Sequence, residues 1–284
     1  MSFSERTLKT EAIVLRRSDF SEADYLVTLY TLTQGKIRAI AKGARKATSR
    51  TTGQVELYAR VHLVLSRGRE LHIITQAEAT PDHAIFQAEF ERGLYASHFV
   101  ELVDQVTYED EENQAAYRLL VAALGWIAQP ETNLRLAARY FEFRLMRVMG
   151  YEPSLFRCAV GEEALAAENQ FFSPADGGVV CEAHGGGRGL LPLALPVFKV
   201  LRHFSRNPWE AVSALHPTEE TLGALERILQ AYWVFCWSAA SKVRIFCGTS
   251  RGRMHEYHPD GHPQREWAAL CAHRGLHPER RSAR

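Results

Sequence analysis

The sequence lacks the short motifs by which many nucleotide-using and hydrolytic enzymes are recognised. It contains no G-x-x-x-x-G-K-[ST] loop, no G-x-G-x-x-G turn, no H-E-x-x-H pair and no G-x-S-x-G elbow. The glycine run at residues 185–187 has neither the lysine nor the following helix that a phosphate-binding loop needs. We therefore expect a protein that is not an enzyme and acts by binding.

Long apolar runs and regularly spaced cysteines are also missing. No apolar stretch approaches the ~18 residues that cross a bilayer, and residues 1–11 lack the apolar core of a secretory signal. The five cysteines are odd in number and irregularly spaced, which does not suit a disulfide framework. These absences predict a cytoplasmic protein without membrane contact. A length of 284 residues at 46% hydrophobic composition allows one large domain or two of medium size.

Charge of one sign is unevenly distributed along the chain. Residues 1–80 carry a net charge of +5, residues 81–200 carry −8 and residues 201–284 carry +4, so the overall +1 conceals three regions. The positive net charge of the first region suits binding of a polyanion such as nucleic acid, whereas the negative net charge of the middle region does not.

Acidic residues are absent from Gly35 to Gly53, in a stretch that begins with two strands. The segment YLVTLYT (25–31) alternates as a strand does, Gln34-Gly35 predicts a tight reversal, and residues 36–41 return beside it. A basic loop follows. Because ordinary surfaces mix charges of both signs, we interpret this loop as a platform for a polyanion.

Taken as a whole, the sequence predicts five strands followed by helices. Five strands within about 80 residues suit a small closed barrel, of either the OB-fold or the SH3-like type. Helical spacing begins after Thr80-Pro81-Asp82, and residues 151–195 interrupt it with many glycines. The expected strands are 9–15, 25–31, 36–41, 55–66 and 71–76, and the expected helices are 85–106, 117–128, 133–149, 195–204 and 221–236 with a continuation toward 246.

Three segments resemble the RecO family of bacterial recombination and repair proteins. They are YLVTLYT…GKIRAIAKGARKATSR, HFVELVDQVTYEDEENQAAYRLL and FRCAVGEEALAAENQFFSPADGGVVCEAH. The resemblance implies an α+β protein in which a five-stranded OB-fold barrel, residues 1–80, precedes an all-α domain, residues 81–247. It also implies a degenerate zinc-ribbon-like insert at about 151–195. We expect residues 248–284 to be a flexible basic tail with at most a short helix near Trp267.

The resemblance further implies a recombination mediator. Such a protein binds single- and double-stranded DNA and anneals complementary strands. It works with RecR and with single-stranded-DNA-binding protein to load the RecA recombinase, and it is associated with the nucleoid.

Basic side chains of the amino-terminal region are the candidate contacts to nucleic acid. Lys36 and Arg38 lie two apart on a strand, so both point to one face. Tyr30, Tyr58 and His62 could add surfaces on which unpaired bases stack. The candidates are Arg16, Arg17, Lys36, Arg38, Lys42, Arg45, Lys46, Arg50, Arg60 and Arg67, with Arg69 beside the last.

The cysteines of the insert form an incomplete metal-binding pattern. The first pair reads Cys158-Ala-Val-Gly161, so glycine stands where the family has its second cysteine, and the second reads Cys181-Glu-Ala-His184. Three candidate ligands are too few for a closed zinc site unless water, an acid or a distant residue completes it. We therefore expect no cofactor and interpret the insert as a metal-free relic of the family's site. The purified protein should hold less than one equivalent of zinc.

Three other interpretations stay open at this point. The basic residues could simply be the charged face of a barrel. An OB-fold could serve RNA rather than DNA, a choice that depends on recognition of the 2′-hydroxyl. A metal-dependent nuclease or hydrolase could use Cys158, Cys181 and His184 around an open coordination position, although no general base is evident beside them.

Overall fold

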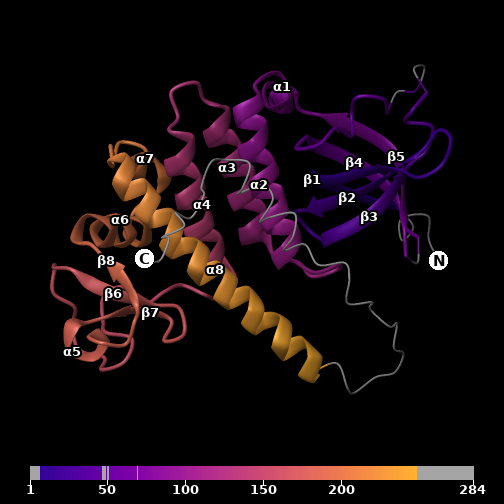
Figure 1. Cartoon of the computed structure of the whole chain (residues 1–284). Coiled ribbons are helices and arrows are strands. Elements are labelled where there is room, and N and C mark those ends of the chain that lie inside the picture. The colour runs from indigo at the N-terminus through magenta and orange to yellow at the C-terminus, as the bar shows by residue number, and fades with distance from the viewer. Residues whose placement is uncertain (1–6, 47–48, 50, 69, 248–284) are drawn as a thin grey trace, which may run out of the picture. The chain divides into compact units, whose positions relative to one another are not determined.

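Five strands form a closed barrel in the computed structural model, which describes residues 7–46, 49, 51–68 and 70–247 (Figure 1). Their order around the barrel is β1-β2-β3-β5-β4, and β1 closes the barrel by pairing with both β2 and β4. β3 and β5 run parallel, and the other neighbours are antiparallel. This is the OB-fold that the resemblance implied. The strands are β1 (Thr7–Asp19), β2 (Tyr25–Thr31), β3 (Gly35–Ala41), β4 (Arg60–Ser66) and β5 (His72–Ala79).

Strand β1 is longer than the predicted 9–15 because it pairs with two strands in succession. Its first half lies beside β4 and its second half beside β2, with a register shift between Val14 and Arg16. A bulge at such a point bends the strand, which lets one strand belong to both sides of a barrel.

Strand β4 is shorter than the predicted 55–66. Val55 and Ala59 are buried as the alternation suggested, but they lie in an irregular loop and not in a strand. Tyr58 has a φ of 68°, in the left-handed region, and this conformation is incompatible with extended backbone. The prediction was wrong because period-two burial arises here from a loop that closes one side of the barrel core.

Helices follow the barrel, and a three-stranded sheet interrupts them (Figure 1). The predicted helix 85–106 is divided, because Glu89 is extended at φ −109° and ψ 105°. Asn113 and Asn133 cap two helices by accepting the amide protons of Ala116 and Leu136 at 3.0 Å. The elements are η2 (Pro81–His83), α1 (Ala84–Ala88), α2 (Phe90–Val106), α3 (Gln114–Ala128), α4 (Leu134–Val148), β6 (Gln170–Ser173), β7 (Gly178–Val180), α5 (Glu182–Gly185), β8 (Leu191–Leu193), α6 (Leu195–Arg206), α7 (Trp209–Val212) and α8 (Glu219–Cys247).

The barrel and the helices share apolar contacts. Ile13, Leu15 and Tyr30 belong to the barrel strands but pack in the core that α2, α3 and α4 form. The Tyr30 hydroxyl donates to the carbonyl of Asn113, and Glu11 on β1 accepts from Tyr117 on α3 at 2.7 Å. The barrel is therefore fixed against the helices by both apolar and polar groups.

The insert depends on the helices for its core. Its sheet has the order β7-β6-β8, with strands of three or four residues. Phe172 of this sheet packs edge-on against Tyr232 of α8, with ring centroids 5.4 Å apart, and Val179 and Leu193 join the same cluster. Strands this short do not enclose a core of their own, so packing on the helices stabilises the sheet.

The carboxyl-terminal helix α8 extends to Cys247, as the predicted continuation toward residue 246 requires. The expected tail at 248–284, including its short helix near Trp267, lies outside the described residues. Within the part of the chain that the structure describes, no helix combines the length and the apolarity needed to cross a membrane.

Candidate functional site

Six of the ten basic candidates form ion pairs with acids from other elements. The pairs are Arg16 and Lys36 with Asp104, Arg17 with Glu56, Arg38 with Glu109, Arg45 with Asp19, and Arg60 with Glu11. An acid beside a cation reduces the net field that an approaching phosphate meets. These six side chains are therefore less available to a polyanion than their positions in the sequence suggested.

Lys36 and Arg38 do share one face of β3, as predicted, but that face meets the helical region. The ammonium of Lys36 lies 3.0 Å from the Asp104 carboxylate of α2 and donates to the Asp104 carbonyl at 2.7 Å. Its side chain is only 13% exposed. Asp110, in the connection after α2, donates its amide proton to the carbonyl of Lys36 at 3.0 Å. Lys36 is thus part of the contact between barrel and helices.

The segment that is acid-free in sequence is not acid-free in space. Lys36, Arg38 and Arg45 lie within it, yet acids from the helical region and from the end of β1 neutralise them. The interpretation that no acid compensates this stretch was wrong for these three residues, because ion pairs form between elements that are distant in sequence.

The loop after β3 keeps two exposed lysines. Lys42 and Lys46 make no ion pair with any residue that the structure describes. The base of the loop is tied down, because Gly43 donates its amide proton to Asp24 at 2.8 Å and Arg45 donates its amide proton to the Ala23 carbonyl at 3.0 Å. The Gly43 hydrogen bond lowers the pKa of Asp24, which keeps this acceptor ionised. Two lysines are thereby presented on an anchored loop.

The other basic candidates lie on or near two turns. Arg67 follows β4 and is exposed, with no ion pair among the described residues. Arg50 and Arg69 fall outside the described residues. The structure therefore assigns no contacts to these two.

The aromatic candidates for base stacking lie mostly in the contact between barrel and helices. Tyr30 is fully buried, which contradicts its expected role as an exposed stacking surface. The hydroxyl of Tyr58 is 2.6 Å from that of Ser97, and its ring meets Phe86 edge-on. His62 has an exposed side chain and remains a candidate.

Cys158 and Cys181 are brought together by the edge of the small sheet. The segment around Cys158 runs beside β7, since Val179 donates its amide proton to the Ser154 carbonyl and Ala159 donates its own to the Val179 carbonyl, both at 2.8 Å. Cys181 follows β7 directly and begins the short helix α5, which carries His184. The amides of Gly161 and Cys181 both point to the Cys158 sulfur at 3.5 Å. The three predicted ligands therefore converge.

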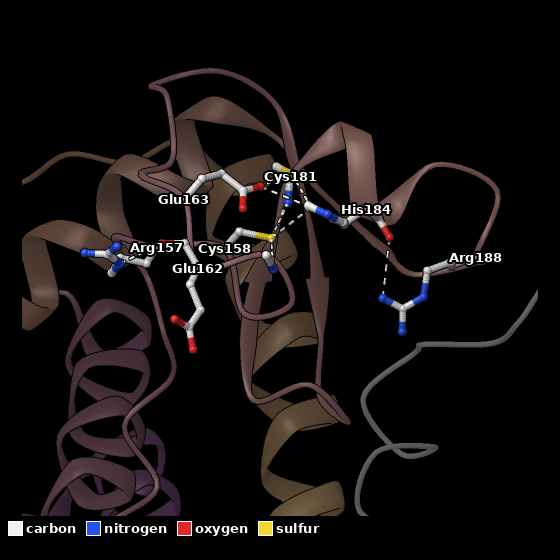
Figure 2. Close-up of polar contacts among 8 residues, drawn as sticks. Arg157, Cys158, Glu162, Glu163, Cys181, His184 and Arg188 are labelled. Carbon is white, nitrogen blue, oxygen red and sulfur yellow. Dashed lines mark hydrogen bonds and ion pairs between the residues drawn. The ribbon is translucent and has the colours of Figure 1, made fainter.

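A fourth potential ligand, Glu163, completes the cluster (Figure 2). Glu163 Oε1 lies 2.7 Å from Cys181 Sγ and 3.1 Å from His184 Nδ1. His184 Nδ1 lies 3.2 Å from Cys181 Sγ and 3.7 Å from Cys158 Sγ. One ligand atom of each residue falls within 4.8 Å of all the others. Among the described residues this is the one group of three or more cysteines, histidines and acids with such spacing.

The protonation of the cluster follows from its hydrogen bonds. The thiol of Cys181 donates to Glu163, which lowers the pKa of that carboxyl to about 2 and raises the pKa of Cys181. Burial favours the neutral thiol at Cys158, but the amides of Cys181, Gly161 and Val160 point to its sulfur and lower its pKa overall. Cys158 is thus the more readily ionised of the two thiols.

The sequence analysis allowed an acid as the fourth ligand but did not identify Glu163, because the C-x-x-C-like spacing places no ligand at position 163. The turn explains its position: Glu162 donates its amide proton to the Cys158 carbonyl, Cys158 donates to the Glu163 carbonyl, and Glu162 adopts a φ of 60°. This reversal brings residue 163 back beside residue 158. The acidic pair Glu162-Glu163, directly after the glycine that replaces a cysteine, was the available signal.

Comparison with known proteins gives matches along most of the chain. The model "Recombination protein O N terminal" matches residues 1–81, and the model "Recombination protein O C terminal" matches residues 87–233. A "DNA repair protein RecO" from Roseiflexus sp. (strain RS-1) is 37% identical over 229 residues, which cover 80% of each chain. The protein of that name from Symbiobacterium thermophilum is 29% identical over 244 residues, or 85% of this chain and 96% of the relative.

Proposed function

Because this chain belongs to the RecO family of DNA repair proteins, we propose that it is a recombination mediator that binds single- and double-stranded DNA and anneals complementary strands. It acts in the cytoplasm, on the nucleoid. It works with RecR and with single-stranded-DNA-binding protein to load the RecA recombinase. No covalent step is required for this function, because annealing needs only that the repulsion between two phosphate backbones be reduced.

The exposed loop after β3 is the observation that supports this proposal. Lys42 and Lys46 are exposed and carry no ion pair within the described residues, whereas candidates on the strands such as Arg16, Lys36 and Arg38 are paired. Ammonium groups that form no ion pair can replace counterions on the phosphate backbone, and here the Asp24 carboxylate lies near both lysines without pairing with either. The loop base is held by Asp24 and Ala23, so the lysines project from a defined place on the barrel.

Salt dependence of binding tests the role of this loop. The variant K42A/K46A should bind a labelled single-stranded oligonucleotide with a slope of log affinity against log salt that is smaller by about 1.4, or about 0.7 per lost phosphate contact. The loss should be equal for different base sequences, because phosphates carry no sequence information. Strand annealing should fall together with binding.

A matched control removes a charge elsewhere. Lys199 on α6 is exposed and forms no ion pair in the described part of the chain, so K199A should leave the slope unchanged. Equal slopes for wild type and a folded K42A/K46A would show that the loop does not contact DNA. Binding of RNA and DNA of equal sequence distinguishes the RNA-binding alternative, which predicts tighter binding of the RNA.

A further inference from the structure

We propose that Cys158, Glu163, Cys181 and His184 form a four-coordinate zinc site in which the Glu163 carboxylate replaces a cysteine. This differs from the expectation based on three ligands, because the fold supplies the acid that would complete the set. The inference concerns the insert and is independent of the DNA-binding loop.

The spacing of the ligand atoms suits a tetrahedral ion. Zinc lies about 2.3 Å from sulfur and about 2.0–2.2 Å from nitrogen or oxygen, so two atoms bound tetrahedrally are about 3.3–3.8 Å apart. The separations from His184 Nδ1 to the two sulfurs, 3.7 and 3.2 Å, and to Glu163 Oε1, 3.1 Å, are close to these values. The 2.7 Å between Cys181 and Glu163 is that of a hydrogen bond, which an ion would replace.

The position of Gly161 shows why Glu163 can take over from a cysteine there. A Cβ atom built on Gly161 would lie 2.2 Å from Glu163 Oε2 and 2.3 Å from His184 Cε1. The space in which a side chain at position 161 would begin is therefore filled by the carboxylate and the imidazole. Glycine at this position and the inward orientation of Glu163 fit each other.

The donor set selects among metals. Two thiolates and an imidazole are soft and borderline donors that suit zinc, whereas calcium and magnesium require oxygen ligands. The backbone amides that point to Cys158 Sγ stabilise a thiolate, as a metal ligand must be. A carboxylate in the fourth position leaves no open position for a reactive water, so the site is a structural one.

Neighbouring residues outside the cluster provide a matched control. The side chain of Glu162 points away from the sulfurs, while that of Glu163 points toward them (Figure 2). The contact that Glu162 makes with Arg157 uses its backbone carbonyl, at 2.6 Å, so a change of its side chain leaves this contact in place. E162Q therefore removes the same charge as E163Q, one residue away and outside the proposed ligand set.

Zinc titration of the full chain after removal of metal by a chelator tests the proposal. Wild type and E162Q should each bind one zinc ion per chain. E163Q should bind it more weakly, by more than the about 10- to 100-fold that loss of a second-shell partner costs. Equal zinc affinity of E163Q and wild type, or no zinc uptake by wild type, would overturn the proposal.

A rescue variant keeps the test decisive if E163Q does not fold. G161C/E163A removes the Glu163 carboxylate and supplies a third cysteine, and the His184 ring, whose Cε1 would lie 2.3 Å from the new Cβ, has to shift within the site. With cobalt in place of zinc, wild type should show the intense visible bands of a tetrahedral ion with two thiolates. The double variant should gain further thiolate-to-cobalt charge-transfer absorption, because the cysteine introduced at position 161 supplies a third thiolate. Weak, octahedral-type bands in wild type, or no gain in the double variant, would contradict the assigned ligands.

Discussion

In the barrel, the candidate DNA-binding cations on the strands pair with acids that come from other elements, whereas in the insert two thiols, an imidazole and an acid of one small segment turn toward each other. The barrel has a core of its own, formed by residues such as Val27, Leu29 and Ile37. The insert has strands of three or four residues and shares its apolar residues with α4, α6 and α8. The difference teaches that the barrel holds its fold by a core of its own, so its exposed charges can be changed, whereas the insert lacks such a core and the proposed metal ligands would help to stabilise it.

The largest effect is expected at Gly35, where the barrel meets the connection after α2. Gly35 has a φ of 66°, and a Cβ there would lie 1.9 Å from the carbonyl oxygen of Glu111. G35A should lower the free energy of unfolding by about 3 kcal/mol or more, the sum of left-handed strain and an overpacked backbone contact. Urea unfolding measures this.

The insert offers the matched substitution. Gly187 also has a positive φ, 76°, but nothing lies within 4 Å of its would-be Cβ. G187A should cost only about 1 kcal/mol, from the backbone conformation alone. Equal costs for the two variants would show that the contact of Gly35 with Glu111 is not tight, and that the barrel is less firmly fixed to the helices than its contacts indicate.

Removal of metal should affect the insert and spare the barrel. If the cluster binds zinc, a hundredfold excess of zinc over its dissociation constant stabilises the folded insert by about 2.7 kcal/mol. Hydrogen exchange of β6 and β7 should therefore accelerate when a chelator is added, and that of β4 should not. Calcium should give no protection, because it does not bind thiolates. Equal acceleration of exchange in β4 and in the strands of the insert would contradict the expectation that zinc stabilises the insert and not the barrel.

A smaller, pH-dependent effect is expected from Glu11, which joins the barrel to α3. Burial favours its neutral form, but hydrogen bonds from Arg60 and Tyr117 lower its pKa below the ordinary 4.5. A lowered pKa in the folded state means that the stabilisation is present above pH 4.5 and is lost as the pH falls through the folded value. E11Q should cost about 1.5 kcal/mol at neutral pH, as for a hydrogen bond to a charged group.

Thermal unfolding of E11Q between neutral and acid pH checks the sign. The difference from wild type should shrink as the pH falls below 4.5, because wild type then loses the same charge. The control is E78Q, which changes an exposed acid of β5 that forms no ion pair among the described residues. A constant difference at all pH values would show that the carboxylate charge of Glu11 does not matter.

The barrel shows which elements of the fold local sequence patterns can predict. Alternation predicted β2 correctly at 25–31, and the Gln34-Gly35 turn gave the start of β3 to within one residue. The same rule failed at Val55 and Ala59, since a loop can bury alternate residues as a strand does. The β2–β3 hairpin is local, so its strands and turn can be recognised in the sequence, whereas the pairing of β1 with β4 joins residues more distant in the chain.

The candidate sites were less predictable because their members come from different elements. The pairing of Lys36 with Asp104 joins β3 to α2, and no spacing rule connects residues so far apart in sequence. The fold thereby removes candidates from the basic set. At the insert it adds one, because the turn between Cys158 and Glu163 returns the acid to the cysteine. In both places the three-dimensional structure is needed to identify which charges are paired and which side chains can act as ligands.

The smallest effect is expected at Asp24, which anchors the basic loop through the Gly43 amide. D24A should accelerate hydrogen exchange at Gly43, because the amide loses its acceptor. D24N keeps an oxygen acceptor and should leave this exchange nearly unchanged. The salt slope of DNA binding should equal that of wild type in both variants, since neither removes a phosphate contact. Affinity should rise slightly in both, because an acid near Lys42 and Lys46 is lost. Equal exchange rates at Gly43 in D24A and D24N would show that the side chain of residue 24 does not hold the loop.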